Sequence, residues 1–222
     1  MDRALRIVLL AGATGLVGRA LLPLLLGSAD YRSVHVLSRR AAPDIVLHAK
    51  LQVHVVDFAR LPTPFPKVDD LFIALGTTIK VAGSETAFRQ VDFDFVVNIA
   101  RAARAAGATR LAVVSALGAD AKSRIFYNRV KGEMQETIAQ LGYESIVIAQ
   151  PSLLLGNRAA LGQPARSGEL WTARLFAPLR SMVPRSLRPI EARDVASAMV
   201  AAMREARHGV RILTSAQMQP SP

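Results

Sequence analysis

The feature that most constrains the fold is a set of three glycines, Gly12, Gly15 and Gly18, spaced three residues apart. An apolar run over residues 7–11 precedes them and a helical pattern over residues 16–26 follows, so they occupy a strand-to-helix turn. In such a turn the first glycine permits the tight bend, the second admits a pyrophosphate, and the third lets the helix pack closely. We therefore expect a dinucleotide to bind at the positive end of this helix, on Gly12, Thr14, Gly15, Leu16, Val17 and Gly18.

Strand-like and helix-like segments alternate along the rest of the chain. Short apolar runs occupy residues 7–11, 34–37, 53–56, 71–75, 111–114, 146–149 and 210–213. Helical patterns occupy residues 16–26, 85–106, 123–141 and 193–206. The alternation predicts an α/β fold, a Rossmann-type doubly wound parallel sheet of about seven strands. We expect one domain over residues 1–222, with a small Gly-, Pro- and Arg-containing cap at about 156–188.

Composition narrows the class of protein. Hydrophobic residues make up 51% of the chain, enough for a large core, yet no uncharged apolar run reaches the ~18 residues that span a bilayer. The chain has no cysteine, which excludes disulfides, thiolate metal sites and a thiol nucleophile. We expect no metal and no membrane partner. Because no secretory signal is evident, we expect a cytoplasmic location.

The chain is strongly basic, with a formal net charge of +11. A basic balance is typical of nucleic-acid binding. Here the arginines are scattered singly, without long basic runs or interleaved aromatic residues. This distribution disfavours nucleic acid as a partner and favours a solvated surface with a pocket for an anionic ligand.

The residues after the second predicted strand bear on cofactor choice. An NAD-selective site places a carboxylate on the ribose about 20 residues after the glycine motif. Here the chain offers Ser38, Arg39 and Arg40 instead. A hydroxyl and guanidinium groups suit a 2′-phosphate, which favours NADP(H) over NAD(H). The alternative is that both arginines are simply solvated.

Two further strand ends supply candidate cofactor residues. Asp57 and Phe58 follow the third predicted strand, where the carboxylate can accept from an adenine amino group or cap the next turn. Both alternatives remain open from the sequence. Leu75, Gly76 and Thr77 close the fourth, where small residues let a cofactor lie across the sheet edge.

Three residues have the chemistry of proton transfer. Ser115 ends the fifth predicted strand, and Tyr127 and Lys131 stand four apart, on one face of the next helix. A free tyrosine has a pKa of about 10, and a neighbouring ammonium group favours its phenolate form. A serine hydroxyl can then hold the substrate oxygen. The alternative is a half-buried tyrosine beside a solvated lysine.

These motifs together resemble the short-chain dehydrogenase/reductase superfamily. Gly12 to Gly18 match the glycine motif of its extended and atypical branches, and Ser115, Tyr127 and Lys131 match its catalytic residues. The chain is more closely similar to small atypical members, the Tat-interacting-protein-like oxidoreductases and their bacterial relatives. That similarity rests on residues 76–78, 114–120, 127–133, 151–156, 189–190 and 194–196. The resemblance implies NADP(H) binding on a Rossmann fold, with Lys131, Pro151 and Ser152 among the cofactor contacts.

The chain departs from this pattern in one place. Many extended members carry a second serine or threonine after the first, where this chain has Ala116. Either Ser115 fills the role alone, or Ser123 substitutes for the missing hydroxyl if its loop folds inward. In the predicted cap, Arg158 and Arg166 either meet an anionic substrate or are solvated.

The sequence thus favours an NADP(H)-dependent oxidoreductase that transfers hydride to or from a small carbonyl or alcohol substrate. The alternative is an NADPH-binding regulatory or scaffold protein without significant turnover, acting through a protein partner or as a homodimer. A third alternative is an epimerase-like protein acting on a nucleotide sugar. It is disfavoured because only about 70 residues follow Pro151, which is little for a sugar-nucleotide domain.

Overall fold

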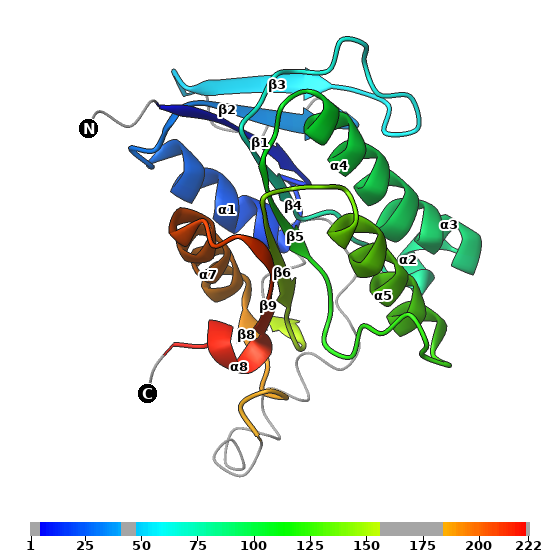
Figure 1. Ribbon diagram of the computed structural model, residues 1–222. Coiled ribbons are helices and arrows are strands. Elements are labelled where there is room, and N and C mark those ends of the chain that lie inside the picture. The colour runs from blue at the N-terminus through cyan, green and yellow to red at the C-terminus, as the bar shows by residue number, and fades with distance from the viewer. Residues whose placement is uncertain (1–4, 41–47, 156–183, 221–222) are drawn as a thin grey trace.

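The architecture is a parallel sheet between two layers of helices (Figure 1). A computed structural model describes residues 5–40, 48–155 and 184–220. Seven strands pair in the order β3-β2-β1-β4-β5-β6-β9, and every pairing is parallel. The strands are β1 (Arg6–Ala11), β2 (Tyr31–Ser38), β3 (Leu51–Val55), β4 (Asp70–Ile73), β5 (Arg110–Val114), β6 (Ser145–Gln150) and β9 (Gly209–Thr214). The predicted seven-stranded Rossmann-type sheet is confirmed.

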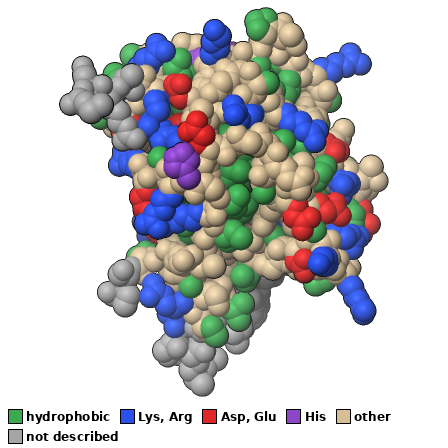
Figure 2. All heavy atoms as spheres, viewed as in Figure 1, with side chains coloured by type: hydrophobic (Ala, Val, Ile, Leu, Met, Phe, Trp, Pro, Cys, Tyr) green, Lys and Arg blue, Asp and Glu red, His purple; other side chains and the backbone are tan. Residues whose placement is uncertain are grey.

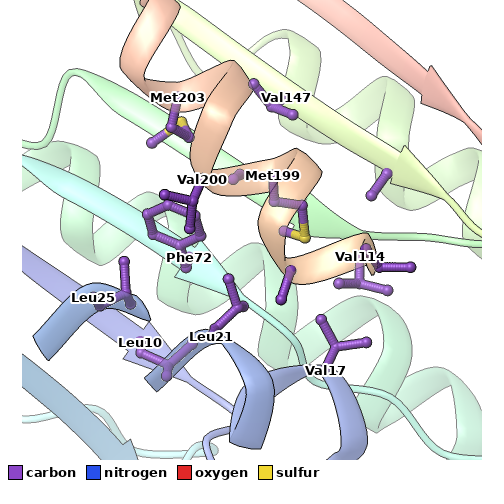
Figure 3. Close-up of a cluster of buried hydrophobic side chains, with 14 of the residues drawn as sticks. Leu10, Val17, Leu21, Leu25, Phe72, Val114, Val147, Met199, Val200 and Met203 are labelled. Carbon is purple, nitrogen blue, oxygen red and sulfur yellow. The ribbon is translucent and has the colours of Figure 1, made fainter. Parts of the chain in front are cut away.

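Each face of the sheet buries one apolar cluster. On one face, α1 (Leu16–Leu26) and α7 (Ala192–Glu205) meet over the strands, and Figure 3 shows Leu21 of α1 and Met199 of α7 close to Phe72 of β4. On the other face lie α4 (Phe95–Ala105) and α5 (Phe126–Ala139). The central strands read as continuous apolar runs because both of their faces are buried.

The helical pattern predicted over residues 85–106 is interrupted in the structure. It consists of α3 (Glu85–Arg89), one π-helical turn η1 (Gln90–Asp94), and α4. A π turn adds a residue to the helical repeat, so it changes which side chains face inward. Here it leaves Asp92 fully buried.

Shorter elements complete the described fold. Two single-turn helices, α2 (Ile79–Ala82) and α8 (Ser215–Met218), follow β4 and β9. A separate two-stranded sheet pairs β7 (Leu154–Leu155) with β8 (Ile190–Glu191). Most of the predicted cap, including Arg158 and Arg166, lies outside the described residues, which stop at 155 and resume at 184.

A buried ion pair links neighbouring strands at their amino-terminal ends. Asp70 at the start of β4 is fully buried and pairs with the Arg110 guanidinium at the start of β5. Tyr31, the first residue of β2, donates its hydroxyl proton to Asp70 at 2.7 Å. Burial, reinforced by the Asp70 carboxylate, raises the pKa of Tyr31 well above its usual range. This cluster stabilises the amino-terminal ends of the strands, at the opposite end of the sheet from the glycine turn.

The strand order creates a crevice at the carboxyl ends of the strands. The chain runs outward through β1, β2 and β3 and then returns to place β4 on the opposite side of β1. In doubly wound sheets, ligands bind where the order reverses, beyond the carboxyl ends of the strands. The glycine turn after β1 and the loop after β4 both lie at this point.

The surface shows no concentration of basic charge on the face in view. Figure 2 shows Lys and Arg side chains spread over it, with acidic side chains among them. Among the residues that the structure describes, no helix is both long and apolar enough to cross a membrane.

Candidate cofactor and active site

The turn after β1 has the geometry that its three glycines predict. Gly12 has a φ of +92°, and a Cβ there would lie 2.6 Å from the backbone of Ala74. A Cβ on Gly18 would lie 1.9 Å from the Gly12 carbonyl oxygen, so only glycine lets α1 pack against the turn. A Cβ on Gly15 would meet nothing closer than 3.5 Å. Gly12 and Gly18 therefore build the turn, while Gly15 keeps space open beside it.

The first turn of α1 presents backbone donors to this space. Gly15 is the N-cap, and no side chain caps the helix. The first N–H groups of a helix have no intrahelical partner, and the helix dipole adds partial positive charge there. Thr14, Gly15, Leu16 and Val17 all line the adjoining cleft. A diphosphate fits the chemistry of this end of the helix.

Two hollows run along the carboxyl ends of the strands. The inner hollow, of about 890 Å³ including space open to solvent, contains predicted site residues Gly15, Leu16, Val17, Leu75, Gly76, Thr77, Ser115, Tyr127, Lys131, Pro151 and Ser152. The outer hollow, of about 650 Å³, contains predicted site residues Gly12, Thr14, Gly15, Ser38, Arg39, Phe58, Leu75 and Gly76. Gly15, Ala74, Leu75 and Gly76 line both hollows, so the two adjoin, and together they are called the cleft below.

Some predicted residues lie elsewhere or are already engaged. Gly18, Arg40 and Asp57 do not line either hollow. The Asp57 carboxylate accepts from the backbone N–H of Ala59 at 2.8 Å, the turn-capping alternative. The Ser38 hydroxyl donates to the Arg40 carbonyl at 2.7 Å, so it is already engaged within the turn after β2. Ser123 accepts from the N–H of Ile125, before α5, and does not substitute for Ala116 in the inner hollow.

The Lys131 ammonium forms a buried ion pair that the sequence analysis missed. Its Nζ lies 2.8 Å from Asp92 Oδ1, and both side chains are almost completely buried. The other Asp92 oxygen accepts from the Thr77 N–H at 2.9 Å. A Cβ on Gly76 would come within 3.9 Å of Nζ, so the loop after β4 lies directly on the ion pair. Asp92 thus joins the π turn, α5 and that loop.

The pair keeps the lysine charged. Burial lowers the pKa of Lys131, but the Asp92 carboxylate, with a smaller contribution from Tyr127, raises it more, and the net pKa is above the usual value. The site therefore holds a fixed ammonium group whose charge is balanced by a carboxylate. The solvated lysine considered from the sequence is not what the structure has.

Ser115 and Tyr127 face the same inner hollow from different elements. Ser115 follows β5, and its N–H donates to the Ala149 carbonyl of β6 at 2.7 Å. The Tyr127 ring packs against the Phe88 ring of α3, with centroids 5.2 Å apart. Strand pairing and ring packing thus hold the two hydroxyl-bearing side chains at one cavity.

A second polar contact was not anticipated. Gln135 donates from Nε2 to Ser115 Oγ at 2.5 Å, and its Oε1 accepts from Gln150 Nε2 at 3.1 Å. Gln135 stands four residues after Lys131, on the same face of α5, and that spacing was the available signal. For Asp92 the signal was a carboxylate placed between the apolar residues Val91 and Phe93.

The carboxyl end of β6 is tied to neighbouring segments by the residues that follow it. The Pro151 carbonyl accepts from the Leu117 N–H at 2.9 Å, which holds the loop after β5. Ser152 donates to the Arg188 carbonyl and accepts from the Ser215 hydroxyl at 2.9 Å. Both residues line the inner hollow while bracing its wall. Across the described residues, no group of three or more metal-ligating side chains is close enough to hold a metal ion.

A family model described as NAD(P)H-binding matches residues 12–149, more than half of the chain. The chain belongs to this NAD(P)H-binding family. The match covers the glycine turn, the loop after β4 and the elements that carry Ser115, Tyr127 and Lys131. The chain therefore has an NAD(P)-binding, oxidoreductase-like fold.

Relatives within this family extend the similarity over most of the chain. The chain is 34% identical over 188 residues to "Protein fmp52, mitochondrial" of Emericella nidulans, covering 82% of this chain and 78% of the relative. It is also 34% identical over 173 residues to "Protein HTATIP2" of Rattus norvegicus, covering 76% of this chain and 69% of the relative. The resemblance to small atypical short-chain dehydrogenases/reductases is confirmed.

Solved structures agree on the fold. A structure titled "MoeE5 in complex with UDP-glucose and NAD" has a TM-score of 0.68 at 16% identity, covering 93% of this chain and 74% of that one. The ADP-L-glycero-D-manno-heptose-6-epimerase of Helicobacter pylori has the same TM-score at 19% identity, covering 96% and 79%. These likenesses show an epimerase-like Rossmann fold.

The expectation of a cytoplasmic location is contradicted. The fungal relatives are named as mitochondrial proteins. The expectation rested on the lack of an evident secretory signal, which does not fix a compartment. Short targeting segments determine the compartment of a protein, and the composition of its folded domain does not.

Proposed function

We propose that this protein is an NADP(H)-dependent oxidoreductase acting on a small carbonyl or alcohol substrate. One observation carries the proposal: the cleft that begins at the phosphate turn contains Ser115, Tyr127 and Lys131 in its inner hollow. A cofactor extended from Gly15 along the cleft would bring its reactive ring to those three side chains. The bound dinucleotide would supply the hydride donor or acceptor.

Three side chains have separate roles in the proposed reaction. Tyr127 donates a proton to the substrate oxygen during reduction and removes it during oxidation. Ser115 holds that oxygen with a hydrogen bond. Lys131, fixed by Asp92 at 2.8 Å, places positive charge beside the phenol and the ribose end of the cofactor. Pro151 and Leu154 contribute apolar surface to one wall of the hollow.

Arg39 supports the preference for the phosphorylated cofactor. It lines the outer hollow together with Phe58, whose ring packs edge-on against Phe95 at 5.8 Å and can support an adenine. We expect Arg39→Ala to weaken NADPH binding by roughly ten- to a hundred-fold, the cost of one charge-assisted hydrogen bond. NADH binding should hardly change, as measured by calorimetry with both cofactors. Arg40→Ala is the matched control, because Arg40 lies outside the hollow; equal losses for both cofactors in Arg39→Ala would reject the assignment.

The phosphate turn provides the test of cofactor binding itself. A Cβ on Gly15 meets only ordinary contacts, so Gly15→Val should fold while its branched side chain occupies the space beside the helix N-terminus. NADPH binding should fall below detection, with an unchanged circular dichroism spectrum. Retained binding in this variant would show that the turn is structural only.

The experiment that tests the whole proposal is a screen for NADPH consumption over aldehydes, ketones and quinones, run after a cofactor titration. Turnover that requires Tyr127 supports the oxidoreductase. Tight NADPH binding with no turnover across the screen would instead support the regulatory alternative.

A further inference from the structure

A hydrogen-bond chain that the roles above do not use ends at Ser115, in the wall of the inner hollow. It runs from Gln150 at the end of β6, through Gln135 on α5, to Ser115 after β5. We propose that Gln135 is a positioning residue that fixes Ser115 as a hydrogen-bond donor toward the substrate. This inference rests on the proposed oxidoreductase function and assigns a direction to one of its hydrogen bonds.

The direction follows from the valences of the groups. A serine hydroxyl has one proton to donate and two lone pairs that accept. Gln135 Nε2 occupies one lone pair of Ser115 Oγ at 2.5 Å, so the Ser115 proton is not needed for that contact. Ser115 is 4% exposed, which leaves few partners other than a molecule in the hollow. A carbonyl oxygen placed there would accept that proton.

Gln150 holds the Gln135 amide in the required orientation. Its Nε2 donates to Gln135 Oε1 at 3.1 Å, which leaves the Gln135 N–H₂ group directed at Ser115. Turning only one of the two amides would bring two carbonyl oxygens or two N–H₂ groups together. The two amides therefore turn only together, and the structure has the arrangement in which Gln135 Nε2 faces Ser115. The reverse arrangement would make Gln135 Oε1 accept the Ser115 proton, and the experiments below distinguish the two.

The orientation of the Ser115 hydroxyl matters more because the next residue cannot replace it. The next residue is Ala116, which lines the same hollow and offers no hydroxyl. Three other hydroxyl-bearing residues described in this hollow already hydrogen-bond to backbone groups, namely Thr77, Thr78 and Ser152. This leaves the Ser115 hydroxyl to share the substrate oxygen. An undirected serine would spend part of its time donating to protein acceptors, and the substrate would lose one fixed contact.

The direction can be measured without turnover. In the NADPH-free protein, the side-chain amide resonances of Gln135 can be assigned by their absence in Gln135→Met. Ser115→Ala should shift those N–H resonances and speed their exchange with solvent. Unchanged Gln135 N–H resonances in Ser115→Ala would overturn the inference, whether or not a substrate is known.

The consequence for catalysis is tested with Gln135→Glu, which keeps the size of the side chain. A carboxylate only accepts, so it would draw the Ser115 proton away from the substrate while still accepting from Gln150. We expect kcat to fall about ten- to a hundred-fold with little change in NADPH affinity. The loss should shrink toward acidic pH, where a protonated side chain can donate again. Gln135→Met, which neither donates nor accepts strongly, should lose less.

Two controls separate positioning from other effects. Gln140→Glu puts the same charge on an exposed position near the end of α5 and should leave kcat unchanged. In a Ser115→Ala background, Gln135→Glu should cause no further loss, because its effect passes through the serine. A full additional loss there would mean that the new charge acts directly on the site, and the positioning role would be rejected. If neither Ser115→Ala nor Tyr127→Phe alters turnover, the proposed function fails instead.

Discussion

Replacing Tyr127 by phenylalanine should lower turnover by roughly 10²- to 10⁴-fold, the contribution typical of a general acid–base group. The substitution removes one hydroxyl and keeps the ring that packs 5.2 Å from Phe88, so the fold should be unchanged. NADPH affinity should also be unchanged, because the backbone N–H groups of the phosphate turn and the Arg39 side chain are the proposed phosphate ligands and the Tyr127 hydroxyl is not. The measurement is kcat and cofactor affinity for the same protein preparation.

Tyr143→Phe is the matched control for this loss. Its hydroxyl donates to the Ala100 carbonyl at 2.6 Å in the core beneath α4, away from both hollows. Losing that bond should cost about 1 kcal/mol of stability and leave turnover unaffected. Undiminished turnover in Tyr127→Phe would remove the tyrosine from the catalytic assignment. A loss of similar size in both variants would point to a general effect on the fold.

The sequence was most informative where one residue type was demanded by geometry. Gly12 and Gly18 are required by a positive φ and by a 1.9 Å approach, so the glycine pattern located the turn and the helix beginning at Leu16. The seven strands were also identified, the central ones because strands covered on both faces appear as short continuous apolar runs. The periodicity and the glycines together predicted the fold class.

The sequence was least informative where side chains distant in the chain come together. Asp92 reaches Lys131 because a π turn interrupts the helix, and an added residue of this kind leaves no regular period to detect. Gln135 reaches Ser115 only because α5 packs close to the loop after β5, where a Cβ on Gly132 would lie 2.0 Å from the Ala121 nitrogen. Tertiary packing determines both contacts.

Asp57 illustrates a second reason why the sequence could not predict the site fully. Its position after the third strand allowed two interpretations, an adenine contact or a turn cap, and both need a carboxylate at the same place. The structure has the cap, with Ala59 as donor. A single residue type at a strand end therefore could not decide between a local bond and a ligand contact.

The ion pair between Lys131 and Asp92 should have the largest effect on stability of any contact in the site. Lys131→Met leaves the Asp92 carboxylate buried beside an apolar side chain, with the Thr77 N–H as its one remaining donor among the described residues. Removing one partner of a buried pair costs about 3–5 kcal/mol. We expect a loss of this size in the free energy of unfolding, measured by urea denaturation. Lys131→Met alone therefore cannot show whether the lysine is catalytic.

The double variant Lys131→Met with Asp92→Asn separates the two roles of the lysine. An asparagine oxygen can still accept from the Thr77 N–H, and no buried charge remains, so most of the lost stability should return. If Lys131 also acts on the phenol and the cofactor ribose, this refolded protein should remain nearly inactive and bind NADPH weakly. Recovery of both stability and turnover would mean that the ammonium serves only to neutralise Asp92. A double variant no more stable than Lys131→Met would mean that lost packing, and not the unpaired carboxylate, accounts for the destabilisation.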